Sequence, residues 1–325
     1  MKYTLIKGTF HVVGQSPDAD SIKFRAASPT LWNEIDTENR DIFTSNFTAE
    51  EGVITVRLEG IDALETHYSA PSLVKGEKAK GYSQPRDLGR LAANAFLEFM
   101  GVTEVKWRTF GKSTYISQAR VNGQAIKTKL TDSIPGYIIT GDIEKNGRPV
   151  SWVFRGQTSL ADGAAVPREK LADLAATSAN VHLLKTGMVY PFFFMTLAAT
   201  VRSALVEAVK QAQAAAPGQP NNIWTLDHST RGLDLTSVRV ITDEKALYPY
   251  LFRKVIKHLQ RVEFNRKQSG VTGDETIPMA GFFNDANPHV FVISEQDFLR
   301  LDDVVEAKGT TIRMKKSPHD IVFLS

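Results

Sequence analysis

Short runs of β-branched and aliphatic residues, separated by turn-forming stretches, predict a β-rich fold for the first half of the chain. An Asn-Gly pair at residues 146–147 predicts a hairpin between the last two of these runs. We expect strands at residues 3–13, 22–26, 53–60, 102–108 (the fourth strand), 136–142 and 149–154. Two polar stretches, residues 27–51 and 109–135, are longer than ordinary connections, and we interpret both as insertions.

Apolar residues that recur about every 3.6 positions predict the helices. We expect helices at residues 87–100, 167–176, 178–185, 194–215 and 243–267. Three more strands are expected near the C-terminus, at residues 290–293, 310–314 and 321–324. The pattern therefore predicts an α+β protein in two parts, a larger domain at residues 1–235 and a smaller α+β module at residues 236–325.

The composition is that of a soluble globular protein. The chain has 325 residues, of which 42% are hydrophobic and 23% are charged. Its net charge of +3 permits nucleic-acid binding without requiring it. The chain contains no cysteine, which excludes thiol catalysis, disulfides and cysteine-based zinc sites.

No stretch of the sequence has the length expected of a membrane span. The most apolar run, residues 187–201, contains Pro191 and ends before Arg202, so it falls short of the roughly 20 apolar residues that a span needs. Lys7 interrupts the N-terminal apolar run, so no signal-peptide core is expected. We expect a cytoplasmic protein without a membrane partner, or a secreted one if a leader has been removed.

Residues 56–66, with the sequence V-R-L-E-G-I-D-A-L-E-T, join a strand to a charged loop. Arg57 lies in the strand, Gly60 permits a bend, and Asp62 and Glu65 follow it. A guanidinium and two carboxylates at such a junction can form a surface ion-pair cluster, which contributes little to stability.

This segment resembles the signature V-R-L-x-G-I-D-x-P-E-T of the staphylococcal nuclease family, with Leu64 where the family has proline. Three further pieces occur in the family order. Residues 18–23, D-A-D-S-I-K, resemble the family's D-G-D-T-x-K, residues 147–148 place an arginine after a strand, and Asn-Ile-Trp at residues 222–224 closes a long helix. The resemblance covers roughly residues 1–230. Ala19 replaces a glycine, and since alanine adopts positive φ only at a cost, we expect a slightly different turn there.

The resemblance implies an OB-type, five-stranded β-barrel with packed helices, and a Ca²⁺ site. The implied ligands are the carboxylates of Asp20 and Asp62 and the backbone carbonyl of Ala63. Threonine stands at the position of Ala63 in the family, but a carbonyl ligand survives that exchange. Glu65 would orient the attacking water.

The resemblance also implies the groups that bind the substrate. Arg57 and Arg148 would clamp the phosphate, because each guanidinium donates paired N–H bonds that a lysine cannot reproduce. Lys145 would contact the substrate from the hairpin, and Tyr190 resembles a family tyrosine near the nucleotide. A tyrosine beside Phe192 is equally typical of a core aromatic, so both interpretations of Tyr190 stay open.

The implied function is that of a Ca²⁺-dependent endonuclease that acts on DNA and RNA and prefers single strands. Cleavage on the 5′-oxygen side would leave 3′-phosphate products. The alternative is a module of the same fold that binds nucleic acid with little or no catalysis. Such modules usually lack the acid-and-arginine set that this chain keeps.

No family resemblance extends over residues 236–325. Within the helix expected at residues 243–267, Arg253, Lys257 and Arg261 share a face opposite the leucine residues. This face is either an ordinary solvated surface or a stripe that follows phosphates. We expect residues 236–325 to hold a substrate or a partner and to be dispensable for phosphodiester chemistry.

Overall fold

The computed structural model describes residues 2–47, 52–70, 72–73, 76, 78–111, 113–128, 131–271 and 273–324. Its contacts divide the chain into two units, each assembled from separate stretches of sequence. The barrel unit consists of Met1–Ile61, Ala92–Thr186 and Thr196–Ala208. The second unit consists of Asp62–Leu91, Gly187–Met195 and Val209–Ser325.

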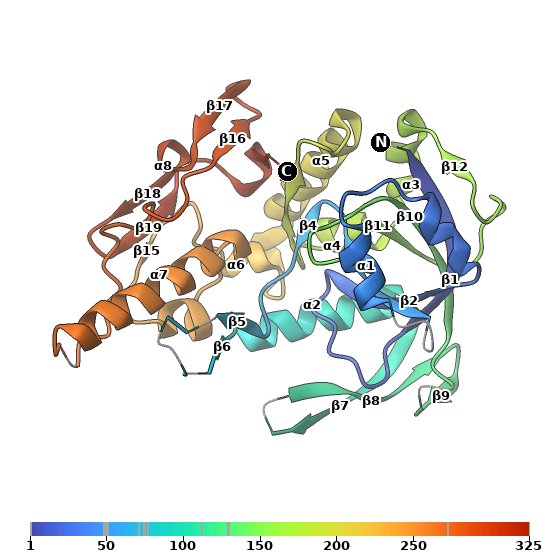
Figure 1. Cartoon of the computed structure of the whole chain (residues 1–325), viewed down its shortest axis with the longest axis horizontal. Helices are drawn as coiled ribbons and strands as arrows, with labels where there is room; N and C mark the ends of the chain where they lie inside the picture. The colour runs from blue at the N-terminus through green and yellow to red at the C-terminus, as the bar shows by residue number, and fades with distance from the viewer. Residues whose placement is uncertain are drawn as a thin grey trace. The chain divides into compact units, whose positions relative to one another are not determined.

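Five strands of the barrel unit close on themselves (Figure 1). They follow the order β10-β11-β3-β2-β1, and β1 pairs again with β10. All pairs are antiparallel except β11 with β3, which is parallel, and a short β12 adds to β1. The strands are β1 (Tyr3–His11), β2 (Ser21–Ala26), β3 (Val53–Leu58), β10 (Ile134–Ile143), β11 (Pro149–Arg155) and β12 (Ala165–Val166). The α+β class and a five-stranded barrel are thus confirmed, and the barrel is compatible with an OB-type fold.

The barrel closes around large apolar side chains that alternate with more exposed ones along each strand. Phe10, Phe24 and Trp152 are fully buried, and the rings of Phe10 and Phe24 lie 4.9 Å apart. Gly8 and Gly136 face each other in β1 and β10, and a Cβ at either would collide with a neighbouring strand carbonyl. Glycine therefore permits the close approach of strands on which closure depends.

The predicted helices are present with shifted ends. They are α2 (Arg86–Phe99), η2 (Arg168–Lys170) followed by α3 (Leu171–Ala175), α4 (Ala179–Lys185) and α5 (Ala199–Ala215). The hydroxyl of Ser178 accepts a hydrogen bond from the backbone N–H of Val181 and caps α4.

Both predicted insertions hold regular structure. Residues 27–47 form η1 (Pro29–Glu34) and α1 (Arg40–Asn46), and residues 48–51 lie outside the described part of the chain. The buried ring of Trp32 lies 5.5 Å from that of Phe43 within the insertion and 6.3 Å from that of Phe24 in β2, and the second contact attaches the insertion to the barrel strands. Aromatic residues within an otherwise polar stretch are the sequence feature that indicates such packing.

The strand predicted as the fourth is real but lies outside the barrel. β7 (Val102–Phe110) pairs with β8 (Ser113–Val121), and β8 with β9 (Gln124–Ile126), in a separate sheet. Most of β7 is exposed or half-buried, with Phe110 79% exposed, so it is a poor barrel strand. The barrel instead continues with β10 and β11.

The second unit joins the end of the chain to earlier segments. β14 pairs with β20, and β15 pairs with β19. Its helices are α6 (Ile223–Leu226), a π-helix η4 (Val240–Glu244), α7 (Pro249–Gln268) and α8 (Leu301–Val304), with single turns η3 (Ala216–Gly218) and η5 (Pro318–Asp320). The short strand β4 (Ile61–Asp62) lies where the chain leaves the barrel unit. The strands of the second unit are β5 (Tyr68–Ala70), β6 (Lys80–Tyr82), β13 (Tyr190–Pro191), β14 (Phe193–Phe194), β15 (Leu233–Asp234), β16 (His289–Val292), β17 (Asp297–Arg300), β18 (Val305–Lys308), β19 (Thr311–Met314) and β20 (Ile321–Phe323).

The predicted division at residue 235 does not coincide with the division into units. Residues 62–91, 187–195 and 209–235 belong to the same unit as residues 236–325. The expected strands at residues 290–293, 310–314 and 321–324 are present, but two of them pair with strands from before residue 236. Whether residues 1–235 fold alone stays a prediction.

Within the described residues, the helices are too short or too polar to cross a membrane.

Asn180 on α4 fastens that helix to two barrel strands. Its side-chain amide donates to the carbonyl oxygens of Glu59 at 2.9 Å and Ser151 at 3.1 Å, and its Oδ1 accepts from the backbone N–H of Val153 at 3.0 Å. The side chain is fully buried. These three bonds satisfy backbone groups that no water can reach.

We predict that Asn180→Ala lowers the free energy of unfolding by about 2–3 kcal/mol, because it leaves buried backbone groups unpaired. Urea denaturation of the two proteins measures the difference. Lys185→Ala, an exposed position on the same helix, should change stability by less than about 0.5 kcal/mol. Equal stability of Asn180→Ala and Lys185→Ala would contradict this role for the amide.

Candidate functional site

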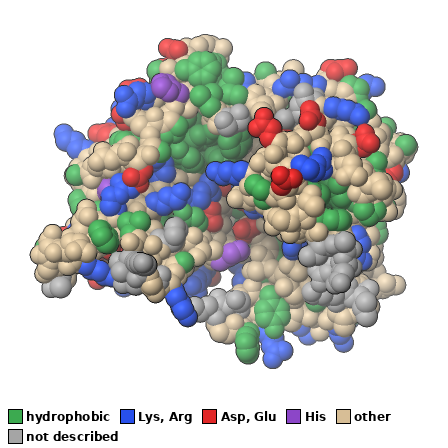
Figure 2. Space-filling view, in the orientation of Figure 1, with side chains coloured by type: hydrophobic (Ala, Val, Ile, Leu, Met, Phe, Trp, Pro, Cys, Tyr) green, Lys and Arg blue, Asp and Glu red, His purple; other side chains and the backbone are tan. Residues whose placement is uncertain are grey.

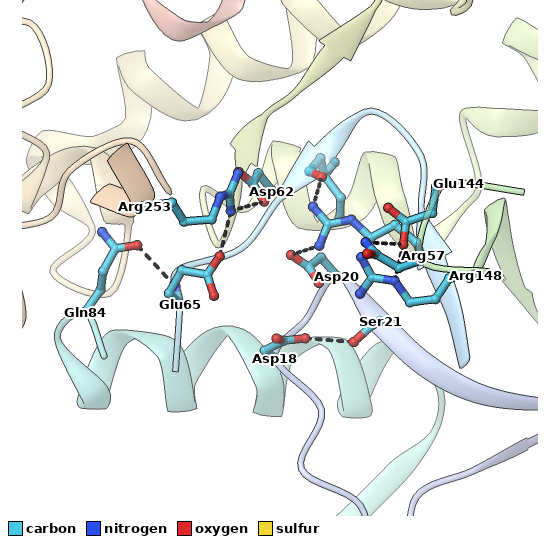
Figure 3. Close-up of polar contacts among 12 residues, drawn as sticks. Asp18, Asp20, Ser21, Arg57, Asp62, Glu65, Gln84, Glu144, Arg148 and Arg253 are labelled. Carbon is cyan, nitrogen blue, oxygen red and sulfur yellow. Dashed lines mark hydrogen bonds and ion pairs between the residues drawn. The ribbon is translucent and has the colours of Figure 1, made fainter. Parts of the chain in front are cut away.

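Four charged side chains of the barrel unit form what we call the barrel group: Asp20, Arg57, Glu144 and Arg148. Arg57 Nη1 lies 2.5 Å from Asp20 Oδ2, and its Nη2 donates to the carbonyl of Ile61 at 3.2 Å. Both side chains are largely buried. Figure 3 shows the Asp20 carboxylate directed at the Arg57 guanidinium, with Arg148 and Glu144 beside them.

Strand register brings Asp20 and Arg57 together. Ser21 lies opposite Arg57 in the β2–β3 pair, and the backbone N–H of Leu58 donates to the carbonyl of Asp20 at 2.8 Å. The Ser21 hydroxyl donates to Asp18 Oδ1 at 2.9 Å and closes the turn that leads into β2. Two sequence motifs separated by more than thirty positions thus converge through one strand pair.

Ala19 adopts a left-handed backbone conformation with φ of 73° and is fully buried. The sequence predicts a slightly different turn here, because positive φ costs a residue with a Cβ about 1–2 kcal/mol. The turn keeps the conformation that glycine favours, and the surrounding strand pairing holds it there. A strained residue directly before Asp20 is typical of a functional turn.

Arg148 enters the barrel group from the hairpin between β10 and β11. Gly147 has φ of 75°, and its N–H donates to the carbonyl of Glu144 at 2.7 Å. The Arg148 guanidinium is bonded to the Glu144 carboxylate. β11 runs parallel to β3 with Val150 opposite Arg57, so Arg148, just before β11, lies near the end of β3 that carries Arg57. Lys145 lies exposed at the hairpin turn.

Asp62, Glu65, Gln84 and Arg253 form a second set, the acidic group, which belongs to the second unit. Arg253 bonds Asp62 through both carboxylate oxygens, with Nη2 2.7 Å from Oδ2 and Nη1 3.2 Å from Oδ1. The same Nη1 lies 2.6 Å from Glu65 Oε1. Figure 3 shows this guanidinium between the two carboxylates.

Gln84 holds Glu65 to the start of α7. Its Oε1 accepts from the backbone N–H of Glu65 at 3.1 Å, and its side-chain amide donates to the carbonyl of Leu247 at 2.6 Å. The backbone N–H of Gln84 also donates to the carbonyl of Glu65 at 2.7 Å. The loop that carries Glu65 is therefore held by backbone and side-chain bonds on both sides.

Arg253 was expected on an outer face of its helix and lies in the acidic group instead. Burial alone would lower the pKa of Arg253, but the carboxylates of Asp62 and Glu65 outweigh it and raise that pKa further, so the cation is permanent. Its guanidinium also lies 5.8 Å from the ring centre of Phe192. Lys257 does remain exposed, and Arg261 pairs with Asp285. Figure 2 shows Lys and Arg side chains along the part of the face where α7 runs in Figure 1.

Tyr190 is a core residue in this structure. Its side chain is fully buried, its hydroxyl donates to Asp227 Oδ1 at 2.8 Å, and its ring lies 5.0 Å from that of Trp224. Burial and the neighbouring Asp227 carboxylate raise the pKa of the Tyr190 hydroxyl. The prediction that Tyr190 contacts a substrate therefore gives way to the core interpretation. Phe192, Tyr250 and Tyr68 are half-exposed aromatics near Arg253.

The residues implied as metal ligands fit a hard cation in their chemistry. Asp20 and Asp62 supply carboxylate oxygens, and Ala63 is buried directly after Asp62. The guanidinium on Asp62 and Glu65 is a stand-in cation, which shows that this position accepts positive charge. Among the described residues, His, Asp and Glu side chains do not gather in threes or more in a way that could hold a metal ion.

Comparison with protein-family models finds none that matches the chain, and comparison with curated proteins finds no match either.

Glu59, inside the motif at residues 56–66, is a buried carboxyl of the barrel unit. Burial raises its pKa to about 7, and the Tyr3 hydroxyl, which donates to its Oε1 at 3.4 Å, opposes that shift. Because the folded pKa lies above the unfolded one, the folded state binds the proton more tightly. The resulting stability is present at acidic pH and is lost as pH rises toward 7.

We predict that the wild-type protein loses about 2–3 kcal/mol of unfolding free energy relative to Glu59→Gln as the buffer changes from about pH 5 to about pH 8. Glutamine keeps an oxygen for the Tyr3 hydroxyl and has no charge to bury. Urea denaturation of both proteins at the two pH values measures this difference. A constant difference between the proteins would show that Glu59 does not titrate in this range.

Proposed function

We propose that the protein is a Ca²⁺-dependent nuclease that hydrolyses phosphodiester bonds of DNA and RNA, with a preference for single strands. The observation that carries the proposal is the pairing of Asp20 with Arg57 at the end of β3 where Arg148 also enters. These residues come from separate motifs, and a barrel-forming strand pair brings them together. Asp62 and Glu65 follow in the same motif as Arg57.

In this proposal Arg57 and Arg148 bind the phosphate. Each guanidinium can donate two parallel N–H bonds to phosphate oxygens, and each is now bonded to a carboxylate, Asp20 or Glu144. Phosphate binding would exchange a carboxylate partner for a phosphate partner. Strands β3 and β11 hold the backbone of both arginines before a phosphate binds, so the two side chains would lose little conformational freedom on binding.

Asp20, Asp62 and the carbonyl of Ala63 would hold the cation, which offsets phosphate charge and makes a bound water more acidic. Glu65 would orient the attacking water and accept its proton. The water oxygen forms a bond to phosphorus, the bond from phosphorus to the 5′-oxygen breaks, and the leaving oxygen takes up a proton. The products are a 3′-phosphate and a 5′-hydroxyl.

A specific observation favours a second candidate function, nucleic-acid binding without hydrolysis. Asp62 and Glu65 are both bonded to Arg253, so each carboxylate has fewer lone pairs left to bind a cation or a water. If these two ion pairs persisted after the substrate bound, the protein would bind nucleic acid without cleaving it. Tight binding of single-stranded DNA with no cleavage across several divalent cations would favour this function.

We predict that denatured plasmid DNA is degraded in the presence of Ca²⁺ and spared when a chelator is in excess. End-group analysis should find 3′-phosphates. Double-stranded plasmid should be cut more slowly, because a stiff duplex backbone adapts to two guanidinium groups less readily than a flexible single strand does. Cleavage that continues in chelator would contradict the metal requirement.

We predict that Arg57→Lys lowers kcat/KM nearly as much as Arg57→Ala, by about 10²-fold or more, because lysine cannot donate two parallel bonds. Steady-state cleavage of a short fluorescent oligonucleotide measures this. Arg155→Lys, at the other end of β11, serves as the matched control and should behave like wild type. Near-normal activity of Arg57→Lys would rule out the phosphate clamp at this position.

A further inference from the structure

We propose that Arg253 is an intramolecular competitor of the metal cation, so that helix α7 sets how tightly Asp62 binds a divalent ion. The inference rests on the proposed function, because it concerns the same Asp62. It assigns to the C-terminal part of the chain a direct role at the site. It also replaces the expectation that residues 236–325 are dispensable there.

The first observation is that the guanidinium engages Asp62 completely. Both carboxylate oxygens accept from Arg253, at 3.2 and 2.7 Å, and the side chain of Asp62 has no exposed surface. A calcium ion bonds carboxylate oxygens at roughly 2.3–2.6 Å and would need the same lone pairs. Two cations so close together repel strongly in a site with little water.

The second observation is that Arg253 satisfies Glu65 as well. One nitrogen, Nη1, serves both Asp62 and Glu65, so a single guanidinium offsets the charge of the pair. A divalent ion has to displace the Arg253 guanidinium before it can bind both carboxylate oxygens of Asp62. The observed affinity would then be the intrinsic affinity reduced by the free energy of the ion pair.

The third observation is that Arg253 is held in place from several sides. Phe192 lies under the guanidinium, and Gln84 connects the loop of Glu65 to Leu247 just before α7. Tyr68 and Tyr250 are the titratable groups that face Arg253 besides the two carboxylates. The guanidinium stays charged throughout, so the competition does not depend on its own titration.

An ordinary structural ion pair predicts a different outcome from a competitor. If Asp62 and Glu65 serve only as a structural ion pair and cannot coordinate an ion, removing Arg253 lowers stability and leaves the affinity for Ca²⁺ unchanged. Removing a competitor lets the cation bind more tightly and makes stability depend on that cation. Cation affinity in the absence of substrate therefore separates the two roles.

The experiment is titration calorimetry of the full chain with Ca²⁺ alone, without nucleic acid. We expect Arg253→Gln to bind Ca²⁺ about tenfold or more tightly than wild type, since glutamine keeps bulk and polarity but removes the charge. Arg253→Lys, which keeps the charge and loses the fork, should lie between them. Lys257→Gln, exposed on the same helix, should match wild type.

A folded Arg253→Gln protein, judged by circular dichroism, that binds Ca²⁺ no more tightly than wild type would overturn the inference. If Arg253→Gln does not fold, the Arg253→Lys protein decides: an affinity equal to that of wild type overturns the inference, and a tighter one supports it. Failure of the proposed function looks different, because wild type would then show no chelator-sensitive cleavage whatever the calorimetry gives.

Discussion

Asp62 is a carboxylate without solvent contact, and a buried charge is tolerated only where an opposite charge and hydrogen bonds meet it. Arg253 supplies both, through two bonds from one planar group. This requirement determines where α7 has to lie relative to the loop of residues 62–65 within the second unit. Gln84 connects Glu65 to Leu247, shortly before α7. This connection keeps the acidic loop and the helix that carries Arg253 in positions where their ion pairs can form.

The barrel group rests on a different kind of constraint. Arg57 and Asp20 meet because β2 and β3 pair in a register that places Ser21 opposite Arg57. Register is fixed by the alternation of buried and exposed positions, and a slip by one residue would turn Arg57 toward the interior. Ala19 adopts its left-handed conformation directly before Asp20, whose carbonyl accepts from the backbone N–H of Leu58 in this register.

These two constraints explain what the sequence could predict. Strand register and hairpin turns leave local patterns, so the strands of the barrel and the Asn-Gly turn before Arg148 were predicted within a few residues. The bond from Arg253 to Asp62 joins positions 191 residues apart and leaves no periodic signal. Arg253, seen only as one cation among three on a helix face, looked like solvated surface.

Burial explains the remaining differences. The identity of a tyrosine does not show whether its side chain faces a substrate or the protein core. Tyr190 is buried, and its hydroxyl donates to Asp227. β7 has the composition of a strand, but its sides are mostly exposed, which suits an outlying sheet better than a closed barrel. Trp32 and Phe43 gave a polar insertion enough apolar surface to fold, which a count of polar residues did not capture.

If the protein is the proposed nuclease, the charges of the barrel group give a physical reason why metal and phosphate binding would be linked. Asp20 and Glu144 offset Arg57 and Arg148, so the group as a whole carries no formal charge. A phosphate that approaches Arg57 must compete with a carboxylate only 2.5 Å away. In the proposed nuclease, Arg57 would donate all of its N–H groups to a phosphate only when Asp20 has another cation to bind. The proposed divalent ion would then matter before any bond is broken, because its binding to Asp20 would release Arg57 for the substrate.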